Sequence, residues 1–171
     1  TLQLKDCLDQ LNKDSQNEKL LNEVEFPLIN VLSKMECEGF NLNSTFLEQM
    51  EVDLGEEITE FEKIIFESAG EVFNLSSPKQ LGVILFEKLN LVDKPKKTRT
   101  GQYSTSEEVL SLLAKKHKII DDILNWRSLN KLQTTYVKAL PEEINTKTKR
   151  IHTIFNQAVA STGRLTSIKP N

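Results

Sequence analysis

Apolar residues recur at intervals of three and four over most of this chain, which predicts a mainly helical protein. One long stripe precedes Gly70 and consists of Leu47, Met50, Leu54, Ile58, Phe61 and Ile65. Another precedes Pro141, which is expected to end its helix, and consists of Ile120, Ile123, Leu124, Leu129, Leu132, Tyr136 and Leu140. Two helices of similar length, separated by a compact insertion, are expected to pack as an antiparallel pair.

Shorter helices are predicted near the start of the chain. Positions at helical spacing between Leu4 and Leu11 predict an amphipathic helix, and residues 12–17 form a polar linker. A second helix is expected to start near Pro27, because a proline in the first turn lacks only an N–H that would be unpaired anyway. Gly39 is expected to end that helix.

The insertion between the two long helices contains two predicted helix starts. Ser77-Pro78-Lys79-Gln80 has the Ser-x-x-Gln form of a capping box, with proline at the first helical position. Thr105 and Glu108 form a second pair of this kind, and residues 92–103 between the two starts form a basic loop. Because helix N-termini present unpaired N–H groups and a partial positive charge, both starts are candidates for binding phosphate. The alternative is that each box only caps its own helix.

The pattern changes after Pro141. Residues 150–159 alternate in polarity and are rich in β-forming residues, which predicts a strand. The predicted fold is therefore mainly α: a long antiparallel helix pair with a small helical tip, plus a short β segment at the C-terminus.

The distribution of charge is uneven. The chain has 38% hydrophobic and 27% charged residues, as globular proteins do, and no apolar run is long enough to span a bilayer. Residues 1–93 carry 7 Lys/Arg and 19 Asp/Glu, a balance of −12, whereas residues 94–171 carry 15 and 6, a balance of +9. Such asymmetry points to a polyanionic partner on the basic side. An exposed acidic helix followed by basic loops, with no partner, is the alternative.

Catalytic and metal-binding patterns are missing from the sequence. Cys7 and Cys37 lack metal-ligand spacing and are expected to be reduced and semi-buried. Adjacent acids such as Asp121 and Asp122 point about 100° apart on a helix and are expected to be surface charge. There is no Gly-rich phosphate loop and no Ser/His/Asp arrangement. His152, in the predicted strand, is expected to be structural or close to a substrate.

Four segments carry motifs in a fixed order. They are EFPLINVLSKMECEG at 25–39, AGEVFNLSSPKQL at 69–81, WRSLNKLQTTYVKALP at 126–141 and RIHTIFNQAVASTGRLTSIKPN at 150–171. These segments resemble the thumb of the family A DNA polymerases, the bacterial DNA polymerase I type, and the start of their palm. The last one is similar to the family's R-[IV]-H-T-x-[FY]-x-Q followed by T-G-R-L-[ST]-S-x-x-P-N. The resemblance covers nearly the whole chain.

The resemblance implies a domain organisation and a function. Residues 1–24 would be the end of an exonuclease-like domain and a linker, 25–141 the thumb and 142–171 the beginning of the palm. The parent protein would be a DNA-directed DNA polymerase, a nucleotidyltransferase of DNA replication and repair, in the bacterial cytoplasm at the nucleoid and without a membrane partner. Mg²⁺ is its expected cofactor and duplex primer–template DNA its partner. The catalytic aspartates and the dNTP site of palm and fingers are expected beyond Asn171, so this chain alone is expected to be inactive.

The residues expected to contact DNA carry hydroxyl, amide or cationic groups. At the two helix starts and the basic loop they are Asn74, Ser76, Ser77, Lys79, Lys97, Thr98, Arg99, Thr100, Ser104 and Thr105. The resemblance implies that Arg127 and Lys131, four residues apart on one helix face, reach the DNA backbone. Gln133 stands where a second basic residue often follows in the family, which implies a weaker phosphate contact.

The T-G-R-L motif implies a contact near the primer end. Gly163 allows a tight turn between Thr162 and Arg164, and the arginine would reach minor-groove acceptors that all correct base pairs share. Asn171 matches a residue on the template side. Two other interpretations stay open: a helical protein-interaction module with an incidental basic edge, and the thumb of a phage or repair polymerase of the same family.

Overall fold

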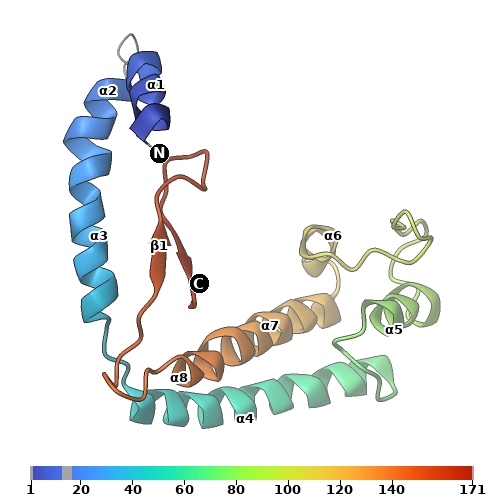
Figure 1. Cartoon of the computed structure of the whole chain (residues 1–171). Helices are drawn as coiled ribbons and strands as arrows, with labels where there is room; N and C mark the ends of the chain where they lie inside the picture. Colours follow the sequence, from blue (N-terminus) through green and yellow to red (C-terminus); the bar gives the residue numbers. More distant parts are fainter. Residues whose placement is uncertain (1, 13–16, 171) are drawn as a thin grey trace. The chain divides into compact units, whose positions relative to one another are not determined.

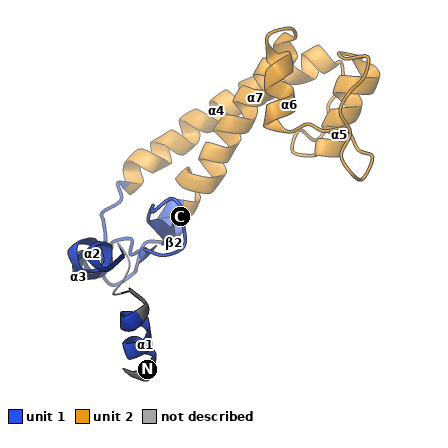
Figure 2. Ribbon diagram, turned by 90° about the horizontal axis from the view of Figure 1, so that it is seen from above, with its two compact units in different colours: residues 1–43, 140–171 blue, residues 44–139 orange. Residues whose placement is uncertain are grey.

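The structure, a computed structural model, describes residues 2–12 and 17–170, with the side chains of residues 4–10 and 17–170 (Figure 1). The chain divides into two compact units: residues 1–43 and 140–171 form unit 1, and residues 44–139 form unit 2 (Figure 2). The described elements are mostly helices, with one two-stranded antiparallel sheet, so the predicted fold class is confirmed. The domain names given to 1–24, 25–141 and 142–171 stay predictions.

Unit 2 is built on the predicted pair of long helices. α4 (Ser44–Ala69) and α7 (Lys118–Leu132) lie side by side and run in opposite directions (Figure 1). Leu54 and Ile65, from the apolar stripe of α4, are buried. Gly70 follows α4 with φ +73°, a left-handed conformation that ends a helix at little cost for glycine.

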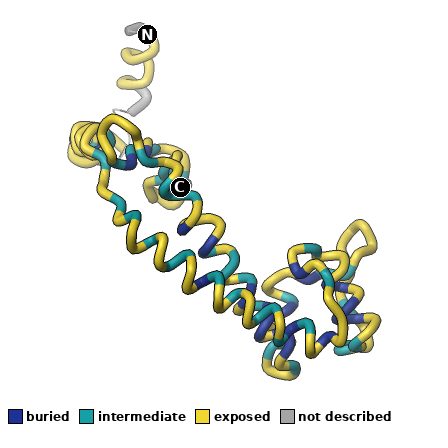
Figure 3. The backbone as a smooth tube through the Cα atoms, turned by 90° about the horizontal axis from the view of Figure 1, so that it is seen from below, coloured by how far each residue is buried: buried dark blue, intermediate teal, exposed yellow. Residues whose placement is uncertain are grey.

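Three shorter helical segments form the tip at one end of this pair. They are α5 (Pro78–Val83), η2 (Ile84–Lys88), which has π-helical hydrogen bonding, and α6 (Glu107–Ala114). Most of the buried residues of unit 2 lie toward this end (Figure 3). The buried cluster consists of Ile65, Ala69, Leu75, Leu81, Ile84, Leu85, Phe86, Leu110, Ile119, Ile120, Ile123 and Trp126. Burial of apolar area therefore fixes the tip on the helix pair.

For the second long helix, the prediction of which residues face inward is wrong beyond Leu132. There the helix continues as η3 (Gln133–Val137), a π-helical segment. Tyr136 is 43% exposed, whereas Gln133 and Val137 are buried. A π turn holds an extra residue, so it shifts the inward-facing positions by one along the sequence. η3 ends at Val137, and Pro141 lies inside a separate short helix, α8 (Ala139–Glu142), so the proline is not what ends the long helix.

The expectation that adjacent acidic residues are surface charge is wrong for Asp122. It is 7% exposed, because it shares the buried face of α7 with Ile119, Ile123 and Trp126 at spacings of three and four. Its Oδ2 has no hydrogen-bond partner among the described residues.

The helices of unit 1 begin earlier than predicted. After α1 (Leu2–Asn12), α2 (Asn17–Leu20), η1 (Leu21–Glu25) and α3 (Phe26–Glu38) follow one another without a break, so the helix does not start at Pro27. The Phe26 amide donates to the Leu21 carbonyl, five residues back. A π turn of this kind changes the local hydrogen-bond pattern, which is how a helix can accommodate an internal proline. The predicted linker at 12–17 falls mainly on residues outside those described.

Unit 1 also contains the sheet. β1 (Ile154–Asn156) pairs antiparallel with β2 (Thr166–Ile168), with Phe155 opposite Ser167 (Figure 1). The predicted strand at 150–159 is therefore shorter than expected, and β2 was not predicted. Phe40 and Ile151 form a separate antiparallel bridge, with mutual hydrogen bonds of 3.0 Å.

None of the described helices is long and apolar enough to cross a bilayer. Cys7 and Cys37 are free, as expected, but both are exposed, so the prediction that they are semi-buried is wrong.

Candidate nucleic-acid interface

The loop before α5 is shaped by its own polar side chains. Ser77 is the N-cap of α5, and its hydroxyl accepts a hydrogen bond from the Gln80 amide at 3.4 Å. The Gln80 side chain accepts from the Asn74 amide at 2.8 Å, and Asn74 Oδ1 accepts from the Ser76 amide at 2.9 Å. The predicted Ser77 cap is therefore present, although Gln80 caps the Asn74 amide instead of the Ser77 amide.

The start of α5 keeps a positive character. Its first turn, all of which the structure describes, holds no acidic residue, and the exposed Lys79 lies in it. Ser76 is exposed close by, whereas Ser77 is half-buried. Because unpaired N–H groups at a helix start carry partial positive charge, this end of α5 is suited to an anion.

Residues 96–104 form a short hairpin that carries the basic loop. Lys97 and Tyr103 make an antiparallel bridge, and the Ser104 amide donates to the Lys96 carbonyl at 2.8 Å. The Lys97 ammonium lies 5.1 Å from the centroid of the Tyr103 ring, within the range of a cation–π interaction. Backbone and ring contacts therefore fix the base of the hairpin.

The hydroxyl groups at the hairpin tip bond locally. Thr98 Oγ1 and Thr100 Oγ1 are 2.9 Å apart, and Thr98 also donates to the Gln102 carbonyl at 3.2 Å. Arg99 is exposed, and Gly101 adopts φ +80°. The tip therefore presents a cationic side chain on a turn that its threonines stabilise.

Tyr103 attaches the hairpin to the buried cluster of unit 2. Its ring centroid lies 5.4 Å from that of Phe86, in a tilted arrangement. Desolvation raises the pKa of the Tyr103 hydroxyl above its ordinary value, and the Glu87 carboxylate raises it further, as an acceptor for the phenol and as a negative charge. The phenol therefore stays neutral over the physiological range.

The predicted capping box of Thr105 and Glu108 is wrong. α6 begins with Ser106 at the N-cap, and within the described chain Ser106 makes no side-chain cap bond. Thr105 is only 6% exposed and serves as an acceptor for Arg127. Glu107 and Glu108 occupy the first turn of α6 and already offset the helix dipole, so this start suits a phosphate less than the start of α5 does.

Arg127 of α7 bonds to the segment before α6. Its Nη1 donates to the Thr105 carbonyl at 2.6 Å, and its Nη2 donates to the Thr105 hydroxyl at 3.4 Å. Burial lowers the pKa of the Arg127 guanidinium from its ordinary value, and the Glu107 carboxylate acts in the opposite direction. Arg127 is thus half-buried and already paired, unlike a side chain held out toward solvent.

Lys131, which was expected to contact DNA, and Gln133, where only a weaker phosphate contact was expected, face different surroundings. Lys131 is exposed. Gln133 is buried, and its side-chain amide donates to the Glu51 carbonyl of α4 at 3.1 Å. The expectation of a phosphate contact at position 133 is therefore wrong, because this side chain packs between the two long helices.

The structure brings many of the predicted residues to one hollow of unit 2. Its volume is about 780 Å³. It is lined by Leu75, Ser76, Pro78, Thr98, Gln102, Tyr103, Ser104, Thr105, Ser106, Trp126, Arg127, Asn130, Lys131 and Thr134. No Asp or Glu is among these described lining residues. Asn130 and Thr134, which the sequence did not single out, lie three residues after Arg127 and Lys131 respectively, on the same helix face.

The T-G-R-L turn belongs to unit 1. The Gly163 amide donates to the Ala160 carbonyl at 3.1 Å, and Gly163 adopts φ +73°, as expected for a tight turn. Thr162 and Arg164 are exposed. Asn171 lies outside the described residues.

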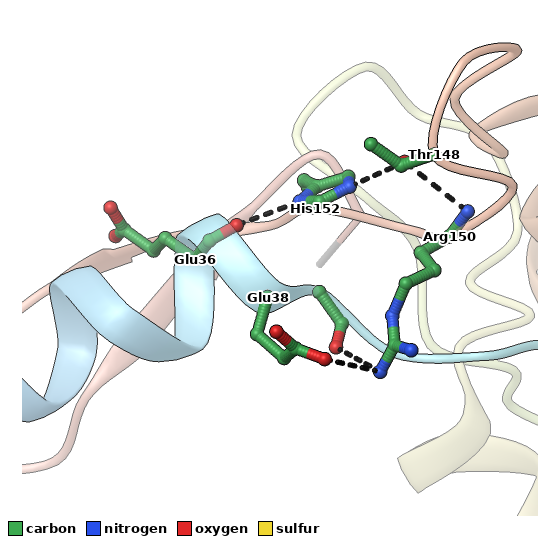
Figure 4. Close-up of polar contacts among 6 residues, drawn as sticks. Glu36, Glu38, Thr148, Arg150 and His152 are labelled. Carbon is green, nitrogen blue, oxygen red and sulfur yellow. Dashed lines mark hydrogen bonds and ion pairs between the residues drawn. The ribbon is translucent and has the colours of Figure 1, made fainter.

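A polar network in unit 1 holds His152 (Figure 4). Its Nδ1 lies 2.8 Å from the Glu36 carbonyl and its Nε2 lies 2.7 Å from the Thr148 hydroxyl. Since a carbonyl only accepts, Nδ1 carries a proton. Arg150 donates to the Gly39 carbonyl at 3.1 Å and pairs with Glu38 at 3.4 Å. These contacts support a structural role for His152.

Two further side chains connect helical residues to the strand region. Glu36 of α3 bonds to β1, and Gln157, just after β1, bonds to Glu25, the residue before α3. The Glu36 carboxylate accepts from the Phe155 amide at 2.7 Å. The Gln157 side chain donates to the Glu25 carbonyl at 3.1 Å and to its carboxylate at 2.8 Å. Glu25, Glu36 and Gln157 belong to quoted motifs, but the sequence gave them no roles, because their partners are more than a hundred residues away.

No group of three or more His, Cys, Asp or Glu among the described residues is arranged to hold a metal ion. The residues present therefore do not fit the paired-metal centre that nucleotidyl transfer uses.

Comparisons with known proteins identify the family of this chain. The model of DNA polymerase family A matches residues 44–171, beginning at the first residue of α4. The chain belongs to the family A DNA polymerases. It is 46% identical to DNA polymerase I of Geobacillus stearothermophilus over 164 residues, which are 96% of this chain and 18% of that protein. It is also 46% identical to DNA polymerase I of Bacillus subtilis over 168 residues, 98% of this chain and 19% of that protein.

A solved structure resembles this member of the polymerase family over almost its full length. It is the POL domain of Pol1 from M. smegmatis, in complex with DNA primer-template and dNTP. The TM-score is 0.82 at 36% identity, covering 99% of this chain and 30% of that one. The chain thus spans about a fifth of the length of the two polymerase relatives named above.

Proposed function

We propose that this chain is the duplex-gripping part of a bacterial DNA polymerase I, with residues 25–141 as the thumb and 142–171 as the beginning of the palm. Residues 1–24 would be the end of a preceding exonuclease-like domain and a linker. The parent protein would carry out template-directed DNA synthesis in replication and repair, in the cytoplasm at the nucleoid. The share of this chain is to hold the duplex product behind the primer end.

The observation that carries the proposal is the composition of the hollow in unit 2. It combines hydroxyl and amide groups with the exposed cation Lys131, and acidic residues are absent from its described lining, although the chain as a whole has a net charge of −3. Hydrogen-bond donors and cations without carboxylates are the chemistry that binds phosphate oxygens. A backbone contact of this kind holds DNA independently of its sequence, which a copying enzyme requires.

Residues around the hollow extend the contact surface. Lys79, Lys97, Arg99 and Thr100 are exposed in the loops of the same unit. Asn74 and Ser77 shape the start of α5, where backbone N–H groups would meet a phosphate.

The proposal assigns Arg164, together with Thr162 and Asn171, to the primer end. An exposed guanidinium on a tight turn can donate to acceptors of the minor groove, which are common to all correct pairs. The complex of the M. smegmatis domain with DNA primer-template and dNTP supports this choice of partner.

The chemistry of nucleotide addition would reside elsewhere in the parent enzyme. It needs carboxylates that hold divalent metal ions, for which Mg²⁺ is our candidate, and the described residues do not provide such a set. The dNTP would likewise be bound by palm and fingers. We therefore propose that the isolated chain binds duplex DNA without extending it.

The test is the salt dependence of duplex binding by the 171-residue chain, measured by fluorescence anisotropy with a labelled primer–template. The logarithm of the association constant should fall linearly with the logarithm of salt concentration, and Lys131→Ala should reduce the slope by about 0.9. Lys63→Ala, at an exposed lysine of α4 outside the hollow, should not change it. Binding that is insensitive to salt would favour a protein-interaction module instead.

A further inference from the structure

We propose that Arg127 is a positioning residue, which holds the wall segment Ser104–Ser106 of the hollow in place rather than contacting phosphate. This inference rests on the proposed function of the hollow. It differs from the role that the family resemblance implied, in which Arg127 reaches the DNA backbone directly.

The guanidinium of Arg127 already has hydrogen-bond partners within the protein. Both Nη atoms donate to Thr105, at 2.6 Å to its carbonyl and 3.4 Å to its hydroxyl. Thr105 is nearly fully buried, and these partly buried bonds lie in the wall of the hollow, which both residues line. Lys131, four residues on, is exposed and can reach a phosphate without breaking an internal bond.

The held segment has a side-chain bond from Ser104 Oγ to Ser106 Oγ at 3.4 Å, but the described residues give it no side-chain cap at the start of α6. Ser106 makes no side-chain cap bond within the described chain, so the usual device for fixing a helix start is missing. The backbone bonds next to it are Ser104 amide to Lys96 carbonyl at 2.8 Å and Leu110 amide to Ser106 carbonyl at 3.0 Å. Arg127 thus connects α7 to the junction between the hairpin and α6.

An arginine suits this task better than a lysine. Its planar guanidinium can donate to two oxygens of one residue at once, whereas an ammonium offers a point charge. Hydrogen bonds from a charged donor are stronger than neutral ones, and partial burial strengthens them further. The negative charge of Glu107 favours the charged form of the guanidinium.

The first arm of the test uses no DNA. Amide hydrogen exchange of Ser104 and Leu110 is measured in the wild-type chain and in Arg127→Ala, Arg127→Lys and Lys131→Ala. Arg127→Ala should accelerate exchange by about tenfold or more, as expected from losing a hydrogen bond to a charged group. Arg127→Lys should restore part of the protection, and Lys131→Ala should leave it unchanged. Unchanged exchange in Arg127→Ala overturns the inference, whether or not the chain binds DNA.

The second arm compares the salt slopes of duplex binding. Arg127→Ala should weaken binding at every salt concentration but keep the wild-type slope, because no phosphate contact is removed, while Lys131→Ala should reduce the slope by about 0.9. A slope for Arg127→Ala that is reduced as much as that of Lys131→Ala overturns the positioning role. Failure of the wild-type chain to bind duplex would contradict the proposed function but would leave the exchange result to decide the role of Arg127 within the fold.

Discussion

Gly82 of α5 lies directly against Tyr103 of the hairpin. A Cβ atom added at Gly82 would come within 2.8 Å of the Tyr103 Cβ, closer than two such carbons approach in proteins. Gly82 is buried, and the tyrosine packs on Phe86 one turn further along. The absence of a side chain at this position therefore sets how closely the hairpin, with its basic residues, can lie on α5.

We expect Gly82→Ala to destabilise unit 2 despite the higher helix propensity of alanine. The propensity gain of roughly 0.5–1 kcal/mol is smaller than the cost of about 1–3 kcal/mol for overpacking a buried contact. Urea unfolding followed by tryptophan fluorescence measures the difference. Gly55→Ala is the matched control, because its Cβ would lie at an ordinary 3.5 Å from the Gln133 amide nitrogen. Equal effects of the two substitutions would contradict the contact.

Gly39 is a second glycine that the packing requires. Its φ is +64°, and a Cβ would lie 2.6 Å from the Ile151 carbonyl oxygen. Gly39→Ala should therefore accelerate amide exchange at Phe40 and Ile151, which bond to each other across this point. Gly70→Ala shares the positive φ but has open space around it, so it isolates the backbone strain. Equal losses of stability in Gly39→Ala and Gly70→Ala would contradict a destabilising clash with Ile151.

The indole of Trp126 donates to the Glu62 carboxylate of α4 at 3.1 Å, across the helix pair. Glu62→Met should cost about 1–3 kcal/mol, because it leaves a buried N–H without an acceptor. Glu62→Gln keeps an acceptor oxygen and should cost less. Trp126 is the single tryptophan, so fluorescence-detected unfolding reports on this site directly. A Met variant as stable as the Gln variant would show that the hydrogen bond contributes nothing.

Arg164→Ala should affect catalysis by the full polymerase more than its binding. If Arg164 donates to the minor groove near the primer end, its loss should reduce primer extension far more than duplex affinity, since the other phosphate contacts remain. Single-turnover extension and equilibrium binding of the same primer–template measure the two effects. Equal losses of primer extension and of duplex affinity would contradict a contact between Arg164 and the primer end.

The regular helices were predictable because their signals are local. The stripe of α4 and the glycine that follows it are both present in the sequence, and α4 spans Ser44–Ala69 as a result. The three described π-helical segments, at 21–25, 84–88 and 133–137, were not predictable. Each inserts one extra residue into a turn and leaves no mark in the composition. The apolar spacing extrapolated along the second long helix was therefore one residue out of phase after Leu132. As a result Tyr136 was assigned to the core in place of Gln133 and Val137.

The candidate site was predictable in its composition but not in its internal contacts. Ser104, Thr105 and Ser106 can all act as helix caps, and Glu107 and Glu108 stand three residues after Ser104 and Thr105. Which of them does so depends on Arg127, more than twenty residues away, which takes the oxygens of Thr105. A helix cap that is determined by a residue far along the chain leaves no local sequence pattern. The same holds for Glu36, whose carboxylate accepts from the Phe155 amide.

The most direct measurement of the central claim is a map of the duplex contact on the chain itself. Amide chemical-shift changes of the isotope-labelled chain, titrated with a short DNA duplex, should concentrate around the hollow, at Ser76, Thr98, Ser104 and Lys131. The amides of Glu56, Glu57 and Glu60, on the exposed acidic face of α4, should stay unchanged. Changes centred on that acidic face, or none around the hollow at saturating DNA, would contradict the account.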